Sequence, residues 1–156
     1  MNATAPALLE FLEGRICVFG FGNRMWSDDG AGSHLAEVLQ GAPGIAVVDG
    51  GFVPENHLEA VVRTDPDTIL LVDATDFGGA PGECRLLQGQ DLAMCGVSTH
   101  AGSPKMLSLY LGNRTGAKLA LLAIQPANSE EGAKLSHAVQ VAIDYLTKVL
   151  KGFGAN

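Results

Sequence analysis

Short apolar runs that alternate with longer amphipathic segments constrain the fold of this chain more than any other feature of its sequence. Residues 68–72 (TILLV) are almost wholly apolar, which is typical of a central strand buried on both faces of a sheet. Similar runs predict further strands at residues 15–21, 45–48, 83–87 and 118–124. Apolar residues at helical spacing predict helices at residues 30–39, 54–63, 103–111 and 130–150. Strands that alternate with helices predict an α/β sandwich around a mostly parallel sheet.

The length and charge of the chain limit the class of protein it can be. Its 156 residues fit a single domain, with residues 1–14 as an N-terminal extension ahead of a core at residues 15–150. The 17 acidic residues outnumber the 10 basic ones and give a formal charge of −7, which argues against nucleic acid or an anionic membrane surface as a partner. No apolar run approaches the roughly 18 residues needed to span a bilayer.

The N-terminal residues and the cysteines predict a cytoplasmic protein. The segment before Arg15 includes Glu10 and lacks the basic residues with which a secretory signal begins, so it is not typical of such a signal. Cys17, Cys84 and Cys95 form no Cys-x-x-Cys pair, which fits a reducing compartment and neither a disulfide framework nor a structural zinc site. Cys17 lies in an apolar run, so we expect a buried thiol that acts as a small hydrophobic residue.

Acidic side chains and one imidazole follow the expected strands. They are Asp28 and Asp29 after the first strand, Asp49 after the second, Asp73 and Asp76 after the third, and His100 in a later loop. Function in such sheets collects at the carboxyl ends of the strands, so these groups are expected at one edge. Carboxylates crowded together repel each other unless a cation or a proton joins them. Two carboxylates and one imidazole form an O/O/N donor set that suits Ni, Zn, Fe or Mn.

Each of these residues also has a purely structural interpretation. Asp28 or Asp29 can serve as a helix cap, and Asp49 can shape the turn before Gly50 and Gly51. His100 can be a hydrogen-bonded loop residue. Composition and spacing alone leave both interpretations open.

Nucleotide binding and the common hydrolase mechanisms find little support in the sequence. Gly20-Phe-Gly22 follows the first strand as in a dinucleotide fingerprint, but Met25 stands where the third glycine is needed. Asp28 and Asp29 would also lie where a pyrophosphate should bind. The chain has no Gly-x-Ser-x-Gly elbow, no His-Glu-x-x-His helix and no P-loop, so its motifs identify no serine or cysteine nucleophile.

The motifs, taken in order, carry a resemblance to a known family. They are residues 20–30 (GFGNRMWSDDG), 48–51 (VDGG), 71–76 (LVDATD), 81–82 (PG), 99–100 (TH) and 124–126 (IQP). In this order the chain resembles the NiFe-hydrogenase maturation endopeptidases, and most closely the branch that processes the large subunit of formate-hydrogenlyase-type hydrogenase 3. The resemblance covers residues 15–150 and departs from the family pattern mainly at residues 26–27 and just after His100.

The resemblance implies a fold, an activity and a site. The fold is a three-layer α/β sandwich of the phosphorylase/hydrolase-like kind, with a twisted, mostly parallel sheet flanked by helices on both faces. The activity is removal of the C-terminal extension of the hydrogenase large-subunit precursor after nickel insertion. Asp29, Asp73 and His100 correspond to the family's metal ligands and are the expected catalytic residues, and Asp49 corresponds to the residue linked to nickel recognition.

The same resemblance sets the expected cofactor and partner. Nickel is expected to arrive in the precursor, and other divalent metals can occupy the same site. The partner is the large-subunit precursor, and the enzyme is expected to be a monomer. The sequence leaves two alternatives to an endopeptidase: a non-enzymatic nickel-checkpoint binding protein with the same site, and a Rossmann-like nucleotide-binding enzyme.

Overall fold

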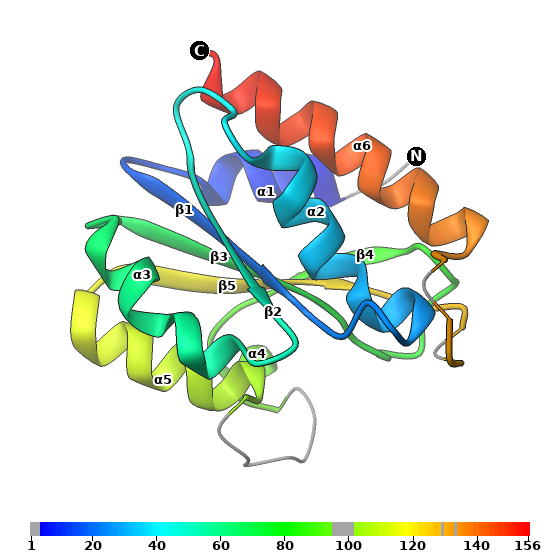
Figure 1. Cartoon of the computed structure of the whole chain (residues 1–156). Helices are drawn as coiled ribbons and strands as arrows, with labels where there is room; N and C mark the ends of the chain where they lie inside the picture. Colours follow the sequence, from blue (N-terminus) through cyan, green and yellow to red (C-terminus); the bar gives the residue numbers. More distant parts are fainter. Residues whose placement is uncertain (1–3, 95–101, 129, 133) are drawn as a thin grey trace.

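A five-stranded sheet forms the middle layer of the computed structural model, which describes residues 4–94, 102–128, 130–132 and 134–156 (Figure 1). The strand order is β2-β1-β3-β5-β4, and β4 alone runs antiparallel to its neighbour. The strands are β1 (Ile16–Phe21), β2 (Ala46–Gly51), β3 (Thr68–Ala74), β4 (Cys84–Leu87) and β5 (Lys118–Ile124). The mostly parallel sheet is therefore confirmed.

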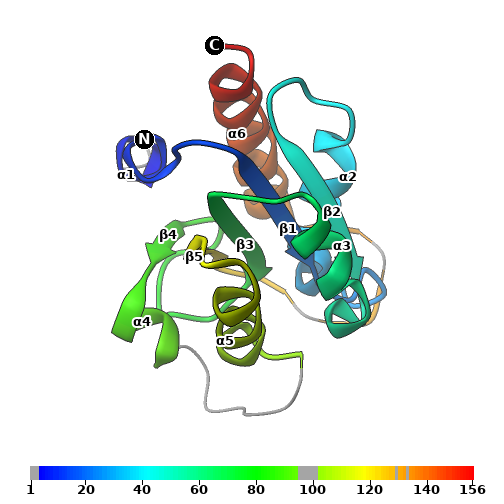
Figure 2. The ribbon, with the colours of Figure 1, turned by 90° about the vertical axis from the view of Figure 1, so that its left-hand side faces the viewer.

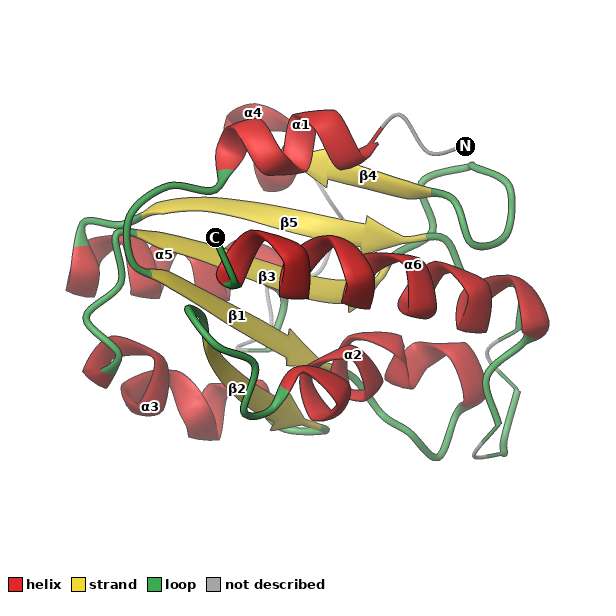
Figure 3. Ribbon diagram, turned by 90° about the horizontal axis from the view of Figure 1, so that it is seen from above, coloured by secondary structure: helices red, strands yellow, loops and turns green. Residues whose placement is uncertain are grey.

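Helices cover both faces of the sheet, so the three-layer α/β sandwich is confirmed as well (Figures 1 and 3). One layer contains α1 (Thr4–Phe11), α2 (Ala31–Leu39) and α6 (His137–Gly154), and the other contains α3 (Leu58–Arg63), α4 (Gly89–Ala93) and α5 (Pro104–Thr115). Two short 3-10 helices, η1 (Ser27–Gly30) and η2 (Pro54–His57), precede α2 and α3. Within the described ranges no helix is long and apolar enough to cross a membrane.

Alternation along the central strands explains why their sequences are apolar throughout. In β3, Leu70 and Val72 pack into the core beneath α1, α2 and α6, whereas Ile69 and Leu71 pack into the core beneath α3 and α5. All four side chains are fully buried. Because side chains point alternately to the two faces of a strand, a strand with helices on both sides needs apolar residues at every position.

The N-terminal residues contribute to the core instead of preceding it. Leu8, Phe11 and Leu12 belong to the same core cluster as α6, and the Thr4 hydroxyl donates a hydrogen bond to the carbonyl of Cys84 in β4. Helix α1 therefore lies beside the edge strand (Figure 2). No local pattern predicts a helix here, and residues within the expected N-terminal extension (1–14) pack into the core.

Some boundaries differ from the sequence prediction in ways that matter for the site. Strands β2 and β3 continue to Gly51 and Ala74, so Asp49 and Asp73 lie within the strands, paired with Gly20 and Ala123, and do not follow them. Helix α6 begins at His137, not at residue 130, because the Ser136 hydroxyl caps it by accepting a hydrogen bond from the backbone N–H of Val139.

Candidate metal-binding active site

The order in which the chain adds strands to the sheet reverses between β1 and β3, and the candidate site lies at the carboxyl ends of these two strands. From β1 the chain runs through α2 to β2 on one side, then returns through α3 to β3 on the other side of β1. Helices α2 and α3 lie on opposite faces of the sheet. A crevice opens where such neighbouring connections diverge, at the carboxyl ends of the strands, and this is where α/β proteins bind ligands.

Asp29 and Asp73 are brought together at this switch point. Asp29 lies on η1 immediately after the β1 loop, and Asp73 lies near the end of β3; both are partly buried. Burial raises the pKa of Asp73 well above its usual range, and the charge of Asp29 raises it further, whereas the backbone N–H of Ala74 opposes both effects. Within the described residues neither carboxylate has a lysine, arginine or histidine ion-pair partner. A pair of this kind suits a cation or a shared proton.

Two glycines allow the start of α2 to approach β3 this closely. A Cβ atom on Gly32 would collide with the carbonyl oxygens of Val72 and Phe21, and one on Gly22, at φ +140°, would collide with the carbonyl of Asp29. Only glycine fits where backbone meets backbone at this distance. The backbone N–H of Asn23 then donates to Asp29 Oδ2 at 3.1 Å and orients the carboxylate.

Asp28 has a different role from its neighbour. It is fully buried, and its carboxylate accepts four hydrogen bonds, from the backbone N–H groups of Ala127, Asn128 and Ser136 and from the Ser136 hydroxyl, at 2.8–3.0 Å. Asp28 therefore holds the segment between β5 and α6 against η1. Neither η1 nor α2 has a side-chain cap, so the helix-cap interpretation of Asp28 and Asp29 is wrong.

A network of hydrogen bonds and ion pairs that the sequence does not predict holds Asp49. Its Oδ1 accepts hydrogen bonds from the Ser33 hydroxyl at 2.7 Å and from the backbone N–H of Gly51 at 2.9 Å. Arg24 lies 3.5 Å from Asp49 Oδ2, donates to Ser33 Oγ at 2.9 Å, and pairs with Glu37 at 3.1 Å. The turn-shaping interpretation of Asp49 thus holds in part, but the carboxylate is also locked to α2.

Asp76 belongs to the architecture of a neighbouring turn. Its Oδ1 accepts from the side-chain amide of Gln125 at 3.1 Å and from the backbone N–H of Gly78 at 3.0 Å, and these bonds lower the pKa of Asp76. The buried Gln125 also accepts from the backbone N–H groups of Phe77 and Gly79. Gln125 therefore fastens this turn to the end of β5.

His100, the third predicted ligand, lies outside the described residues, as does Cys95. Among the residues that the structure does describe, no group of three histidine, cysteine or acidic side chains could hold a metal ion. Two of the three predicted ligands are thus placed together, and the third stays a prediction. Cys17 is buried as expected, and burial raises the pKa of its thiol to about 11.

A doubly covered α/β sheet with two carboxylates at its switch point, neither with an ion-pair partner among the described residues, is the arrangement of an α/β enzyme. The model of the hydrogenase maturation protease family matches residues 31–152. The hydrogenase 3 maturation protease of Escherichia coli K12 is 35% identical over 144 residues, which is 90% of each chain.

Solved structures agree with this match. The NiFe-hydrogenase maturation protease HycI from Thermococcus kodakarensis aligns with a TM-score of 0.86 at 26% identity, over 96% of this chain and 99% of that one. The endopeptidase HycI from Escherichia coli aligns with a TM-score of 0.78 at 33% identity, over 92% and 93%. The chain belongs to the hydrogenase maturation protease family, whose members are peptide hydrolases. Membership favours the endopeptidase interpretation over the checkpoint-protein and nucleotide-binding alternatives.

Proposed function

We propose that this chain is a nickel-dependent endopeptidase that removes the C-terminal extension of a NiFe-hydrogenase large-subunit precursor, with nickel presented by the precursor itself. The observation that carries the proposal is the pair formed by Asp29 and Asp73 at the switch point, two partly buried carboxylates with no ion-pair partner among the described residues. A cation placed between them would relieve the repulsion that raises the pKa of Asp73.

The donor chemistry fits a metal that arrives with other ligands already attached. Two carboxylate oxygens, with or without the imidazole of His100, make a set without a thiolate, which alone binds nickel weakly. Ligands from the precursor would complete the coordination, so cleavage would depend on nickel having been inserted. When bound, the metal would polarise the scissile carbonyl or lower the pKa of an attacking water.

The chain's own residues prepare the site for this encounter. The backbone N–H of Asn23 orients Asp29. The four hydrogen bonds of Asp28 hold η1 against the segment between β5 and α6. Asp49, on the neighbouring strand, is fixed by Ser33 and Arg24, which suits a residue that must present its carboxylate in one orientation. The preorganised positions reduce the entropy lost when precursor and metal bind.

Intact-mass spectrometry of a nickel-loaded large-subunit precursor from the same organism tests this function. The wild-type protein should release a discrete C-terminal peptide, whereas the Asp29→Asn variant should not. Asp144→Asn, an exposed change on α6, serves as the matched control and should cleave like wild type. Cleavage by Asp29→Asn at the wild-type rate would refute the ligand assignment. No mass change with wild type, on precursor whose nickel content has been verified, would refute the proposed function.

A further inference from the structure

Four large apolar side chains are exposed on the two loops beside the candidate site. Met25 and Trp26 follow β1 and are 65% and 45% exposed, and Phe52 and Val53 follow β2 and are 73% and 39% exposed. We call these four residues the apolar rim. A single exposed apolar residue needs no explanation, but a group of them at the functional edge of a sheet is typical of an interaction site.

The backbone holds the apolar rim outward. The two loops are joined by a hydrogen bond of 2.9 Å from the N–H of Gly22 to the carbonyl of Gly51. Trp26 also forms a parallel β-bridge with Gly132, flanked by a 2.7 Å hydrogen bond from the Gly132 N–H to the Met25 carbonyl. Arg24, the residue before Met25, points inward to Ser33. Met25 and Trp26 are therefore exposed on a segment that these hydrogen bonds hold, and the loop that carries Phe52 and Val53 is joined to it at Gly51.

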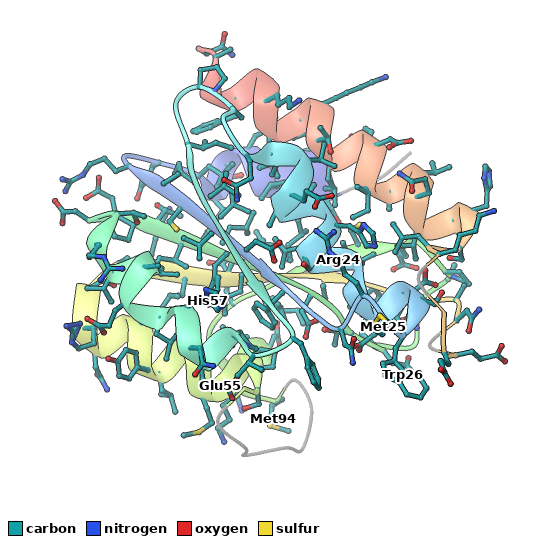
Figure 4. All side chains as sticks on the ribbon, viewed as in Figure 1. Arg24, Met25, Trp26, Glu55, His57 and Met94 are labelled. Atoms are coloured by element: carbon teal, nitrogen blue, oxygen red, sulfur yellow. The ribbon has the colours of Figure 1, made fainter. Side chains whose placement is uncertain are left out.

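Figure 4 shows how these side chains lie on the molecule. Trp26 projects from the loop after β1 at the lower edge, and Met94 and Glu55 project toward the same edge in this view. Trp26 is three residues before Asp29 in the sequence, and Phe52 is three residues after Asp49. The apolar rim therefore lies on the same two chain segments that carry Asp29 and Asp49.

Acidic groups border the apolar rim and indicate the charge of its occupant. Glu55 lies on η2 just after Val53, and it has no hydrogen bond or ion pair within the described residues. Glu130 and Glu131 precede Gly132, the residue bridged to Trp26, and both are exposed. Such a border favours a partner with basic groups near its apolar ones. A second copy of this chain would bring the same formal charge of −7 and would be disfavoured.

We propose that the apolar rim binds the segment of the precursor that adjoins the cleavage point, as an extended peptide with apolar side chains flanked by basic ones. The inference rests on the proposed function and adds to it the surface and the chemistry of recognition. Methionine and aromatic side chains suit this role because they cover large apolar areas and adapt to different contacts. The rim therefore supplies binding energy, while Asp29 and Asp73 meet the metal.

Trp26 is the only tryptophan of the chain, so its fluorescence reports directly on the occupancy of the rim. The probe is a synthetic peptide that spans the cleavage point of the precursor, titrated without nickel so that binding is measured apart from cleavage. A saturable blue shift of the emission is expected, because a half-exposed indole becomes covered. A peptide whose basic residues are replaced by glutamate should bind about tenfold more weakly at low ionic strength.

Variants separate the rim from the rest of the surface. Phe52→Ser and Val53→Ser should each raise the KM for nickel-loaded precursor, together by about tenfold or more, with little change in kcat, because they remove binding and not chemistry. Val141→Ser, the same change at a comparably exposed position on α6, should leave both constants unchanged. Urea denaturation of each variant confirms that folding is intact.

The outcomes distinguish this inference from the proposed function. Cleavage by wild type without a fluorescence shift, and with unchanged KM in the Phe52 and Val53 variants, would overturn the rim assignment and leave the endopeptidase standing. A fluorescence shift without any cleavage would support the rim and refute the activity. A concentration-dependent dimer that the rim variants dissociate, with no effect of peptide, would assign the rim to a second copy and overturn the proposal.

Discussion

Asp28→Ala should lower the free energy of unfolding by about 4 kcal/mol although it removes only one small side chain. The carboxylate is fully buried and accepts four hydrogen bonds, three at Oδ2 and one at Oδ1. Alanine leaves three backbone N–H groups and the Ser136 hydroxyl without their acceptor. Each orphaned donor costs about 1–3 kcal/mol before water enters the space, so we expect a net loss of about 4 kcal/mol.

The measurement is urea denaturation, followed by circular dichroism. With a denaturant slope of about 2 kcal/mol per molar, a loss of this size lowers the midpoint by about 2 M urea. Asp28→Asn should fall in between, because an amide oxygen at the Oδ2 position keeps three acceptor contacts but its NH₂ group faces the Ser136 N–H.

Asp29→Asn is the matched control, one residue away and of the same chemistry. Asp29 accepts a single backbone hydrogen bond and repels Asp73, so its loss should leave the midpoint unchanged or raise it slightly. A midpoint for Asp28→Ala within about 0.5 M of wild type would show that the four bonds contribute little, and the anchoring role of Asp28 would be refuted.

Three further predictions follow from groups near the site. Because burial and Asp29 raise the pKa of Asp73, the folded state loses stability as the pH rises through that raised pKa. Urea denaturation in EDTA should therefore find Asp73→Asn more stable than wild type at about pH 8, and this advantage should disappear in acid. Burial raises the pKa of Cys17 to about 11, so peptide mapping should find it alkylated by iodoacetamide only after unfolding, and labelling of the native protein would contradict its burial. Ser33→Ala removes the 2.7 Å bond to Asp49 and should lower precursor cleavage about tenfold at nearly unchanged stability; an unaltered rate would show that Asp49 needs no such support.

The fold could be predicted from the sequence because its signals are local. The middle residues of the central strands are apolar on both faces, and α2 and α6 each have one apolar stripe, so the alternation of these segments predicts the layers. The missed helix α1 is short, and its boundary depends on contacts with β4 and α6 that no local pattern contains. Leu135 continues the helical spacing and so predicts an earlier start for α6, whereas the hydrogen bonds that Ser136 makes with Val139 and Asp28 decide the boundary.

The candidate site could be predicted only as far as residue types and strand ends allow. The sequence places carboxylates at one edge, and the structure brings Asp29 and Asp73 together there. Composition and spacing could not separate Asp28 from Asp29, because their difference depends on partners about 100 residues away, and only the family resemblance selected Asp29. Local patterns also do not predict the contact of Arg24 with Asp49, because it joins the loop after β1 to strand β2 through a serine on α2.

The long-range bonds of Asp28 also set an order of assembly. Its partners lie 99, 100 and 108 residues further along the chain, and they belong to the segment that follows β5. Contacts between residues this far apart in the sequence form late in folding, because the chain must lose the entropy of closing a long loop before these contacts can stabilise it. The backbone bridge of Trp26 with Gly132 shares this dependence.

During synthesis, therefore, β1 and its loop leave the ribosome long before the residues that fix them in place. The loop that carries Asp29 takes its final position only once the chain is nearly complete. The pair formed by Asp29 and Asp73 and the apolar rim are thus completed together and last, and a partly synthesised chain would have neither in its final geometry.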